Sequence, residues 1–185
     1  MFHIYLLCTG NRCRSPIAEA AVRTLAQGLP VKVESAGVLE LGPTPVLPEV
    51  QRVAAFMGLD VAEHRARHFN SVDLSSADLV LGLERWHVAN AVVEGGAPHE
   101  KAFTLREFVL LLAEAEAPEG TDPAERARAL VQSAHEIRVR DRAFVPGLDI
   151  KDPSGGPRRA YVRTAAEIYE LCRRVIEGTF GRMAA

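Results

Sequence analysis

A cysteine and an arginine six residues apart stand where an apolar segment meets a helical pattern. Cys8 follows the apolar residues 4–7, and Arg14 precedes a Ser-Pro pair that is typical of a helix start. In a strand-to-helix turn, backbone N–H groups and the positive end of the helix favour a bound anion. The guanidinium of Arg14 adds donors that fit a phosphoryl group, and the same potential favours a thiolate at Cys8. The spacing predicts a phosphate-binding loop with a sulfur nucleophile.

Each part of this motif also has a purely structural interpretation. Cys8 could be a small buried apolar residue, Gly10 and Asn11 an ordinary turn, and Ser15 a helix cap. The combination favours the phosphate-binding interpretation, because its parts are common singly but not together. The residues expected to bind the phosphate are Thr9, Gly10, Asn11, Arg12, Cys13, Arg14 and Ser15.

A nucleophile at Cys8 needs a partner acid, because the alkoxide or phenolate that it expels is a poor leaving group. Asp152 is the candidate, since Asp-Pro followed by Ser154-Gly155-Gly156-Pro157 predicts a loop that could place a carboxyl group over the phosphate. Asp149 is the alternative acid, and a turn or capping role for Asp152 is the structural alternative. We expect Cys8 to form a cysteinyl-phosphate that water, activated by Asp152, then hydrolyses. No metal or cofactor is expected.

The elements that must position these groups alternate along the chain. The expected strands are residues 2–8, 31–36, 78–83 and 101–105. The expected helices are residues 16–28, 48–58, 84–94, 106–113 and 157–178. This order predicts a three-layer α/β fold, with a four-stranded parallel sheet and helices on both faces. Ligands of such sheets bind at the carboxyl ends of the strands, where Cys8 lies.

Composition limits the class of protein. The 185 residues, 48% of them hydrophobic, suit one domain over residues 1–185. A net charge of -2 gives no electrostatic case for nucleic acid. No apolar run approaches the ~20 residues of a membrane span, and we expect a cytoplasmic protein. Three cysteines do not form a secreted disulfide framework, and we expect Cys172 in the core. Composition does not predict the oligomeric state.

Residues 113–146 differ in character from the rest of the chain. An acidic stretch precedes Asp122-Pro123, which predicts a helix start, and a mixed-charge run then continues to Arg142. We interpret the segment as an acidic linker followed by a surface helix. It is either a solvated insertion without a chemical role or a lid or docking element beside the acid loop.

The segment from Cys8 to Pro16 resembles the signature of the low molecular weight protein tyrosine phosphatases. Arsenate reductases and bacterial protein arginine phosphatases share the fold of that family. Further landmarks follow in the family order: residues 33–37, 58–60, 64–67, 77–81 and 152–153. The resemblance covers most of the chain except about residues 113–146, which are atypical of the family. It implies a flavodoxin-like fold of the phosphotyrosine phosphatase I type and a phosphorylated protein as substrate.

The resemblance also implies supporting roles. The family's loop-holding network corresponds to Asn11, Ser15, Ser35 and His64, with the Ser15 hydroxyl on the nucleophilic sulfur. Cys13 corresponds to a residue that can form a protective disulfide with the nucleophile. Arsenate reduction is not expected, because residues 73–105 contain no cysteine. His64 and His68 have the spacing of a metal pair but no evident third ligand, so we expect no zinc site.

Arg12 and the residues after Asp152-Pro153 bear on the choice of substrate. Arg12 replaces the aliphatic residue of the tyrosine phosphatases and the threonine of the arginine phosphatases, although Thr9 matches the latter. A cation at this position favours an acidic phosphopeptide. Small residues follow the Asp-Pro pair in place of aromatic ones, which leaves Leu39, Leu41 and Trp86 as candidate walls of a phosphotyrosine slot. We expect a tyrosine phosphatase. The alternatives are a phosphatase for phosphoarginine or small esters, and a phosphate-binding or redox-sensing module with little turnover.

Overall fold

The computed structural model describes residues 1–119, 122–141 and 146–181. Four parallel strands form one sheet in the order β2-β1-β3-β4. The strands are β1 (Phe2–Cys8), β2 (Val31–Gly37), β3 (Leu79–Gly82) and β4 (Ala102–Thr104). The two inner strands, β1 and β3, are apolar and buried along almost their whole length, with His3 as the partly exposed exception, because both of their faces are covered.

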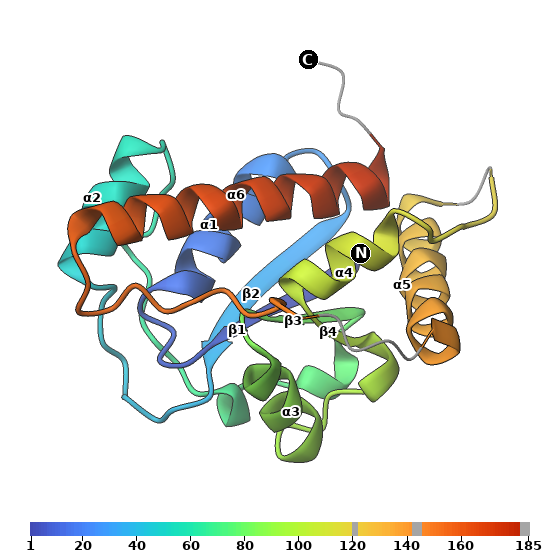
Figure 1. Ribbon diagram of the computed structural model, residues 1–185, viewed down its shortest axis with the longest axis horizontal. Helices are drawn as coiled ribbons and strands as arrows, with labels where there is room; N and C mark the ends of the chain where they lie inside the picture. The colour runs from blue at the N-terminus through green and yellow to red at the C-terminus, as the bar shows by residue number, and fades with distance from the viewer. Residues whose placement is uncertain (120–121, 142–145, 182–185) are drawn as a thin grey trace.

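Helices cover both faces of this sheet (Figure 1). They are α1 (Arg14–Leu25), α2 (Pro48–Phe56), α3 (Arg85–Val93), α4 (Leu105–Leu112), α5 (Pro123–Asp141) and α6 (Arg158–Phe180), with short 3-10 turns at Phe69–Ser71, Leu74–Ser76 and His99–Lys101. The larger core lies under α1, α2, α4 and α6, and the smaller one lies under α3 and the turns around residues 69–76. The predicted three-layer α/β fold is confirmed, with element ends shifted by a few residues.

The sheet order places the carboxyl end of β1 at a switch point. The chain leaves β1 toward β2 on one side, and β3 pairs with β1 on the other side. The loops that follow β1 and β3 therefore diverge beside Cys8 and leave room for a ligand between them. The loop before α6 reaches the same place, because the N–H of Ile150 donates to the carbonyl oxygen of Leu83 (2.8 Å). Three distant segments thus meet at one edge of the sheet.

Helix α5 is part of the core, which corrects the prediction of a solvated insertion. One side of this helix is buried and consists of Ala124, Ala127, Leu130, Val131, Ala134 and Ile137. Near its end the guanidinium of Arg138 lies 4.1 Å from the ring centre of Phe103 and donates to the carbonyl oxygen of Ala102 (2.7 Å). The apolar stripe was hidden in the sequence by the charges that surround it. Of the predicted segment, residues 120–121 and 142–145 lie outside the described part of the chain.

The buried side of α5 gives a direct stability test. Val131→Ala is expected to lower the free energy of unfolding by ~2 kcal/mol, because it removes two buried methyl groups and leaves a small cavity. Val139→Ala is the matched control, since Val139 lies on the same helix and is 46% exposed. Urea unfolding of the two variants measures the difference. Equal stability would contradict the packing of α5 on the core.

No helix in the described ranges is long and apolar enough to cross a membrane.

Candidate active site

The loop after β1 presents a row of backbone donors. Within the described residues, the N–H groups of residues 9–13 donate no hydrogen bond to the protein. Asn11, at the centre of this loop, adopts a left-handed backbone with φ of 50°, which is uncommon for a residue other than glycine. Its side chain holds that conformation: the oxygen Oδ1 accepts from the N–H of Arg67 (3.0 Å). A turn of this kind, followed by α1, has the geometry of an anion site.

Cys8 lies at the base of the loop. Its residue is 2% exposed, and its Sγ atom lies 3.0 Å from Oγ of Ser15 in the first turn of α1. Ser15 in turn accepts from Nδ2 of Asn11 (2.9 Å). The sulfur therefore contacts a hydroxyl that a second side chain orients, so the predicted contact between Ser15 and the sulfur is present in the structure.

Arg14 is fully buried and held on several sides. Its Nη1 forms an ion pair with Glu84 and donates to the carbonyl oxygen of Ile150 (2.7 Å). Its Nη2 donates to Oγ1 of Thr9 (2.9 Å) and to Oδ2 of Asp152 (2.7 Å). Among the described residues, Nε is a buried donor without a partner. Since an unpaired buried N–H is costly, this donor is suited to a ligand oxygen in the loop.

Asp152 is the predicted acid that reaches this group. Burial alone would raise the pKa of its carboxyl group, but hydrogen bonds from Ser154 and the charge of Arg14 lower it below the usual value. Asp149, the alternative acid, instead accepts from the N–H of Arg85 at the start of α3 (2.7 Å). The structure therefore brings Cys8, Arg14 and Asp152 together and directs Asp149 elsewhere.

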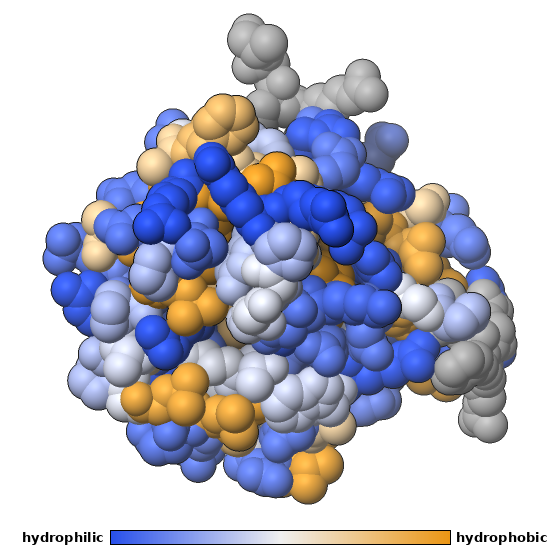
Figure 2. Space-filling model, turned by 60° about the vertical axis from the view of Figure 1, so that its left-hand side comes forward, coloured by the Kyte–Doolittle hydropathy of each residue, from blue (hydrophilic) through white to orange (hydrophobic). Residues whose placement is uncertain are grey.

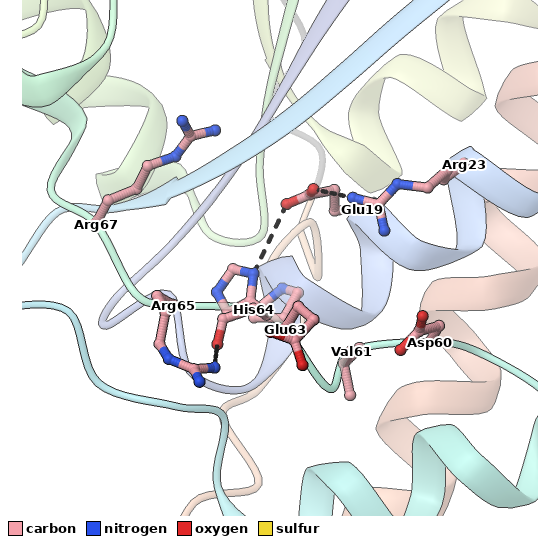
Figure 3. A pocket seen from close by; sticks show the side chains of 9 residues that line it. Glu19, Arg23, Asp60, Val61, Glu63, His64, Arg65 and Arg67 are labelled. Carbon is pink, nitrogen blue, oxygen red and sulfur yellow. Dashed lines mark hydrogen bonds and ion pairs between the residues drawn. The ribbon is translucent and has the colours of Figure 1, made fainter.

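The predicted supporting residues form one connected network behind the loop. Nδ2 of Asn11 donates to Oγ of Ser35 (2.8 Å), and Nε2 of His64 donates to the carbonyl oxygen of Asn11 (2.8 Å). Ser35 also donates to Glu19 (2.6 Å), which Figure 3 shows between His64 and Arg23. Burial lowers the pKa of His64, which favours its neutral form. The network explains how a strained loop keeps one shape.

The cavity in Figure 3, about 310 Å³, lies on the far side of this network. Its lining includes Glu19, Arg23 and His64 but neither Cys8 nor Asp152. It is therefore distinct from the place where the sulfur, the arginine and the acid meet.

Glu84 and His87 belong to the site and were missed by the sequence analysis. His87 is fully buried: its Nδ1 accepts from the N–H of Glu84 (2.9 Å), so Nε2 donates to Oγ1 of Thr9 (3.1 Å). Burial, aided by the charge of Arg14, lowers the pKa of His87 to about 3, and the ring is neutral. Glu84 and His87 thus fix Arg14 and Thr9 from the end of β3. Their position directly after a buried strand was the available signal.

Gly37 is the last residue of β2, and the structure leaves no room for a side chain there. A Cβ atom at this position would lie 2.9 Å from the backbone nitrogen of Asn11 and 3.0 Å from the carbonyl oxygen of Thr9. The end of β2 thus supports the loop after β1 by close backbone contact. A larger residue would displace the loop.

Gly37→Ala is expected to lower kcat/KM for p-nitrophenyl phosphate by roughly 10- to 100-fold, because small displacements of a positioned group are costly in rate. Gly178→Ala is the matched control. Gly178 lies inside helix α6, and a Cβ atom there would make an ordinary contact of 3.6 Å with the side chain of Leu112. Steady-state kinetics of both variants provide the comparison. A Gly37→Ala variant with unchanged rate would refute the support role.

Of the remaining predicted residues, Arg12 and Cys13 lie in the loop and Cys172 lies in α6. Nε of Arg12 donates to the carbonyl oxygen of Pro45 (3.0 Å). Burial, with Asp152 and Cys8 nearby, raises the pKa of Cys13 to about 12, so its thiol stays protonated. The three cysteines are free, and the disulfide between Cys8 and Cys13 stays a prediction. Cys172 is fully buried in the core as predicted.

The three candidate slot walls lie beside the loop. The N–H of Leu39 donates to the carbonyl oxygen of Thr9 (2.9 Å), and a Cβ at Gly10 would meet the side chain of Leu41. Trp86 is 39% exposed, and its Nε1 donates to Oε2 of Glu84 (3.1 Å). Leu39 and Leu41 are also exposed, at 48% and 46%.

His68 does not join His64 in a metal site. Nε2 of His68 lies 3.2 Å from the carbonyl oxygen of Val38, whereas His64 faces Asn11. In the part of the chain that the structure describes, no group of three histidine, cysteine or acidic side chains is arranged to hold a metal ion.

The protein thus has a parallel α/β fold in which Cys8, Arg14 and Asp152 meet at the carboxyl end of β1. The family model for low molecular weight phosphotyrosine protein phosphatases matches residues 3–138. The protein-arginine-phosphatase of Bacillus subtilis is 30% identical over 93% of both chains. The probable low molecular weight protein-tyrosine-phosphatase EpsP of Ralstonia nicotianae is 43% identical over 44% of this chain. The matching region spans 54% of the length of EpsP.

A crystal structure of a low molecular weight protein tyrosine phosphatase from T. tengcongensis superposes with a TM-score of 0.70 at 29% identity, covering 96% of this chain and 99% of that one. The protein belongs to the low molecular weight phosphotyrosine protein phosphatase family. The predicted family and the phosphatase fold are thereby confirmed.

Proposed function

We propose that the protein hydrolyses phosphotyrosine in proteins through a cysteinyl-phosphate on Cys8. One observation carries the proposal: the sulfur of Cys8, the buried guanidinium of Arg14 and the carboxyl group of Asp152 converge on a loop whose N–H groups have no acceptor in the described structure. Family membership supports it. We also propose that residues 1–185 form a single phosphatase domain and that the protein acts in the cytoplasm.

In the first step, the thiolate of Cys8 attacks phosphorus. A P–S bond forms as the P–O bond to the leaving group breaks, and Asp152 donates its proton to the departing oxygen. The loop amides and Arg14 hold the three remaining phosphoryl oxygens, on which charge accumulates. Positioning and electrostatic stabilisation thus supply most of the rate acceleration.

In the second step, the carboxylate of Asp152 takes a proton from water, and that water attacks phosphorus. The P–S bond breaks, and the pair of electrons returns to sulfur. The hydroxyl of Ser15, 3.0 Å from Sγ, stabilises the departing thiolate. The residues described here complete the cycle with acid-base and nucleophilic groups alone.

The acid role of Asp152 predicts a pH dependence. Asp152 must be protonated at the start of the first step, and its pKa is lowered in the free protein. We therefore expect kcat/KM for p-nitrophenyl phosphate to fall as the pH rises from acidic to neutral. In Asp152→Asn this decline should disappear, because no proton is left to lose. A variant with the same decline as the parent would assign it to another group.

A phosphoarginine substrate is the second candidate, because the arginine phosphatase of B. subtilis matches this chain over nearly its full length. Arg12 argues against it. Its side chain is partly exposed and has no ion pair among the described residues, so it would repel a substrate guanidinium. The same cation would attract the acidic residues of a phosphotyrosine peptide.

The deciding experiment compares kcat/KM for one peptide sequence that carries either phosphotyrosine or phosphoarginine, with p-nitrophenyl phosphate as the general substrate. We expect the phosphotyrosine peptide to be hydrolysed faster. In Arg12→Thr the preference should shift toward phosphoarginine, since the repelling charge is gone. Faster hydrolysis of phosphoarginine by the parent protein would replace the first candidate by the second. Failure on all three substrates would leave a phosphate-binding module.

A further inference from the structure

A groove of about 490 Å³ lies between the end of α2 and the start of α6. Its lining combines apolar and cationic side chains: Val53, Phe56, Arg158, Arg159, Val162 and Arg163. Phe56 is 84% exposed and Val162 is 40% exposed. We call this surface the α2–α6 groove. On the face that Figure 2 brings forward, strongly hydrophilic side chains run beside hydrophobic ones.

The arginines of this groove have no partner in the described structure. The side chains of Arg158, Arg159 and Arg163 form neither an ion pair nor a hydrogen bond with any described residue. Elsewhere on α6 the pattern differs: Arg173 pairs with both Glu170 and Glu177. The groove therefore presents positive charge that the protein does not neutralise itself.

This arrangement opposes helix stability. Arg158 and Arg159 occupy the first turn of α6, which contains no acidic residue, and cations are unfavourable at that positive end of a helix. Arg159 and Arg163 are four residues apart, a spacing at which like charges repel. Both the cations at the helix N-terminus and the like charges four residues apart destabilise α6, and no acidic side chain of the described residues pairs with them. Such locally unfavourable arrangements are expected at functional sites.

The groove adjoins the candidate active site. The loop that carries Asp152 leads directly into Arg158, the first residue of α6. Val53, in the wall of the groove, also lines a narrow space together with Cys13 and Pro153. A peptide whose phosphorylated residue lies in the loop can therefore continue along the groove.

We propose that the α2–α6 groove binds an acidic segment of the phosphoprotein substrate, with an apolar side chain of that segment against Phe56 and Val162. The proposal rests on the proposed function and names its substrate class. The three unpaired guanidinium groups favour carboxylates, and the exposed apolar side chains of Phe56 and Val162 favour one aliphatic or aromatic side chain beside them. A concave surface fits a peptide better than a flat anionic membrane.

The test uses two phosphotyrosine peptides that differ only outside the phosphotyrosine. One carries aspartate, glutamate and leucine, and the other carries asparagine and glutamine in place of the acidic residues. The parent protein is expected to show a higher kcat/KM for the acidic peptide. In the double variant Arg158→Glu with Arg159→Glu, the ratio of the two kcat/KM values should fall about tenfold or more, through KM. Glutamate suits the first turn of a helix, so this variant should fold.

Two further variants separate the contributions. Phe56→Ala should reduce kcat/KM for the acidic peptide while preserving its dependence on salt. Arg174→Glu is the matched control, because it reverses an exposed charge on the same helix some ~24 Å from Arg158. Its peptide ratio should equal that of the parent.

The rate with p-nitrophenyl phosphate reports on the proposed function separately from the groove. Turnover of this small ester without any preference for the acidic peptide would overturn the groove proposal and leave the catalytic one intact. A ratio unchanged in Arg158→Glu with Arg159→Glu would do the same. Co-sedimentation of the parent protein, but not of the double variant, with anionic lipid vesicles, together with equal rates on both peptides, would assign the groove to a membrane surface instead.

Discussion

Cys8→Ser is expected to lower turnover of p-nitrophenyl phosphate by at least ~10³-fold while phosphate still binds. A hydroxyl group is a far weaker nucleophile than a thiolate near neutral pH, and serine would be a poor leaving group in the second step. The loop amides and Arg14 are unchanged by this substitution, so the anion site persists. Steady-state kinetics and calorimetric titration with inorganic phosphate measure the two properties separately.

Cys172→Ala is the control for this experiment. It also removes a thiol, but from the fully buried core position on α6, where the loss should affect stability and leave kcat unchanged. A Cys8→Ser variant that retains the parent rate would exclude a covalent role for the sulfur. A variant that loses phosphate binding together with activity would point to a collapsed loop.

Asp152→Asn is expected to reduce kcat/KM by ~10²- to 10⁴-fold, with the larger effect on the poorer leaving group. The phenol of tyrosine has a pKa near 10, so its departure depends on a donated proton. p-Nitrophenolate is a more stable anion and leaves more easily without one. The ratio of rates for p-nitrophenyl phosphate and phosphotyrosine should therefore rise in the variant.

Asp149→Asn is the matched control, since it makes the same change three residues earlier. Asp149 accepts from the backbone of Arg85 and does not contact Arg14, so its loss should weaken the start of α3 and leave the leaving-group dependence unchanged. If instead Asp149→Asn alters that dependence and Asp152→Asn does not, the two acids exchange roles.

The sequence predicted those parts of the site that are local in the chain. Cys8, Arg14 and Ser15 lie within one turn of backbone, and their spacing alone defines the loop. Asp152 followed from its Asp-Pro context and from the family resemblance. Strands β1 and β3 were predictable because they are almost entirely apolar and buried on both faces, which differs from the apolar stripes of the helices.

What the sequence did not show depends on contacts between distant segments. Glu84 and His87 reach Arg14 and Thr9 only because β3 pairs with β1. Gly37 is constrained by the backbone of the loop that β2 approaches, and nothing beside it in the chain signals that contact.

The sequence of helix α5 favours a solvated interpretation because half of its buried residues are alanine. Charges on the other sides of the helix dominate its composition. Burial of alanine leaves only a weak periodic signal, although it lets the helix approach the core closely.

The central claim is that Cys8 carries the phosphoryl group during turnover, and mass spectrometry of acid-quenched protein tests it most directly. The parent protein, mixed rapidly with excess p-nitrophenyl phosphate and quenched in acid, is digested and its peptides are sequenced. We predict one added phosphoryl group on the peptide that contains Cys8, attached to the sulfur of Cys8, and none on that peptide without substrate. A phosphoryl group on any other residue, or full turnover with none bound to the protein, would contradict the account.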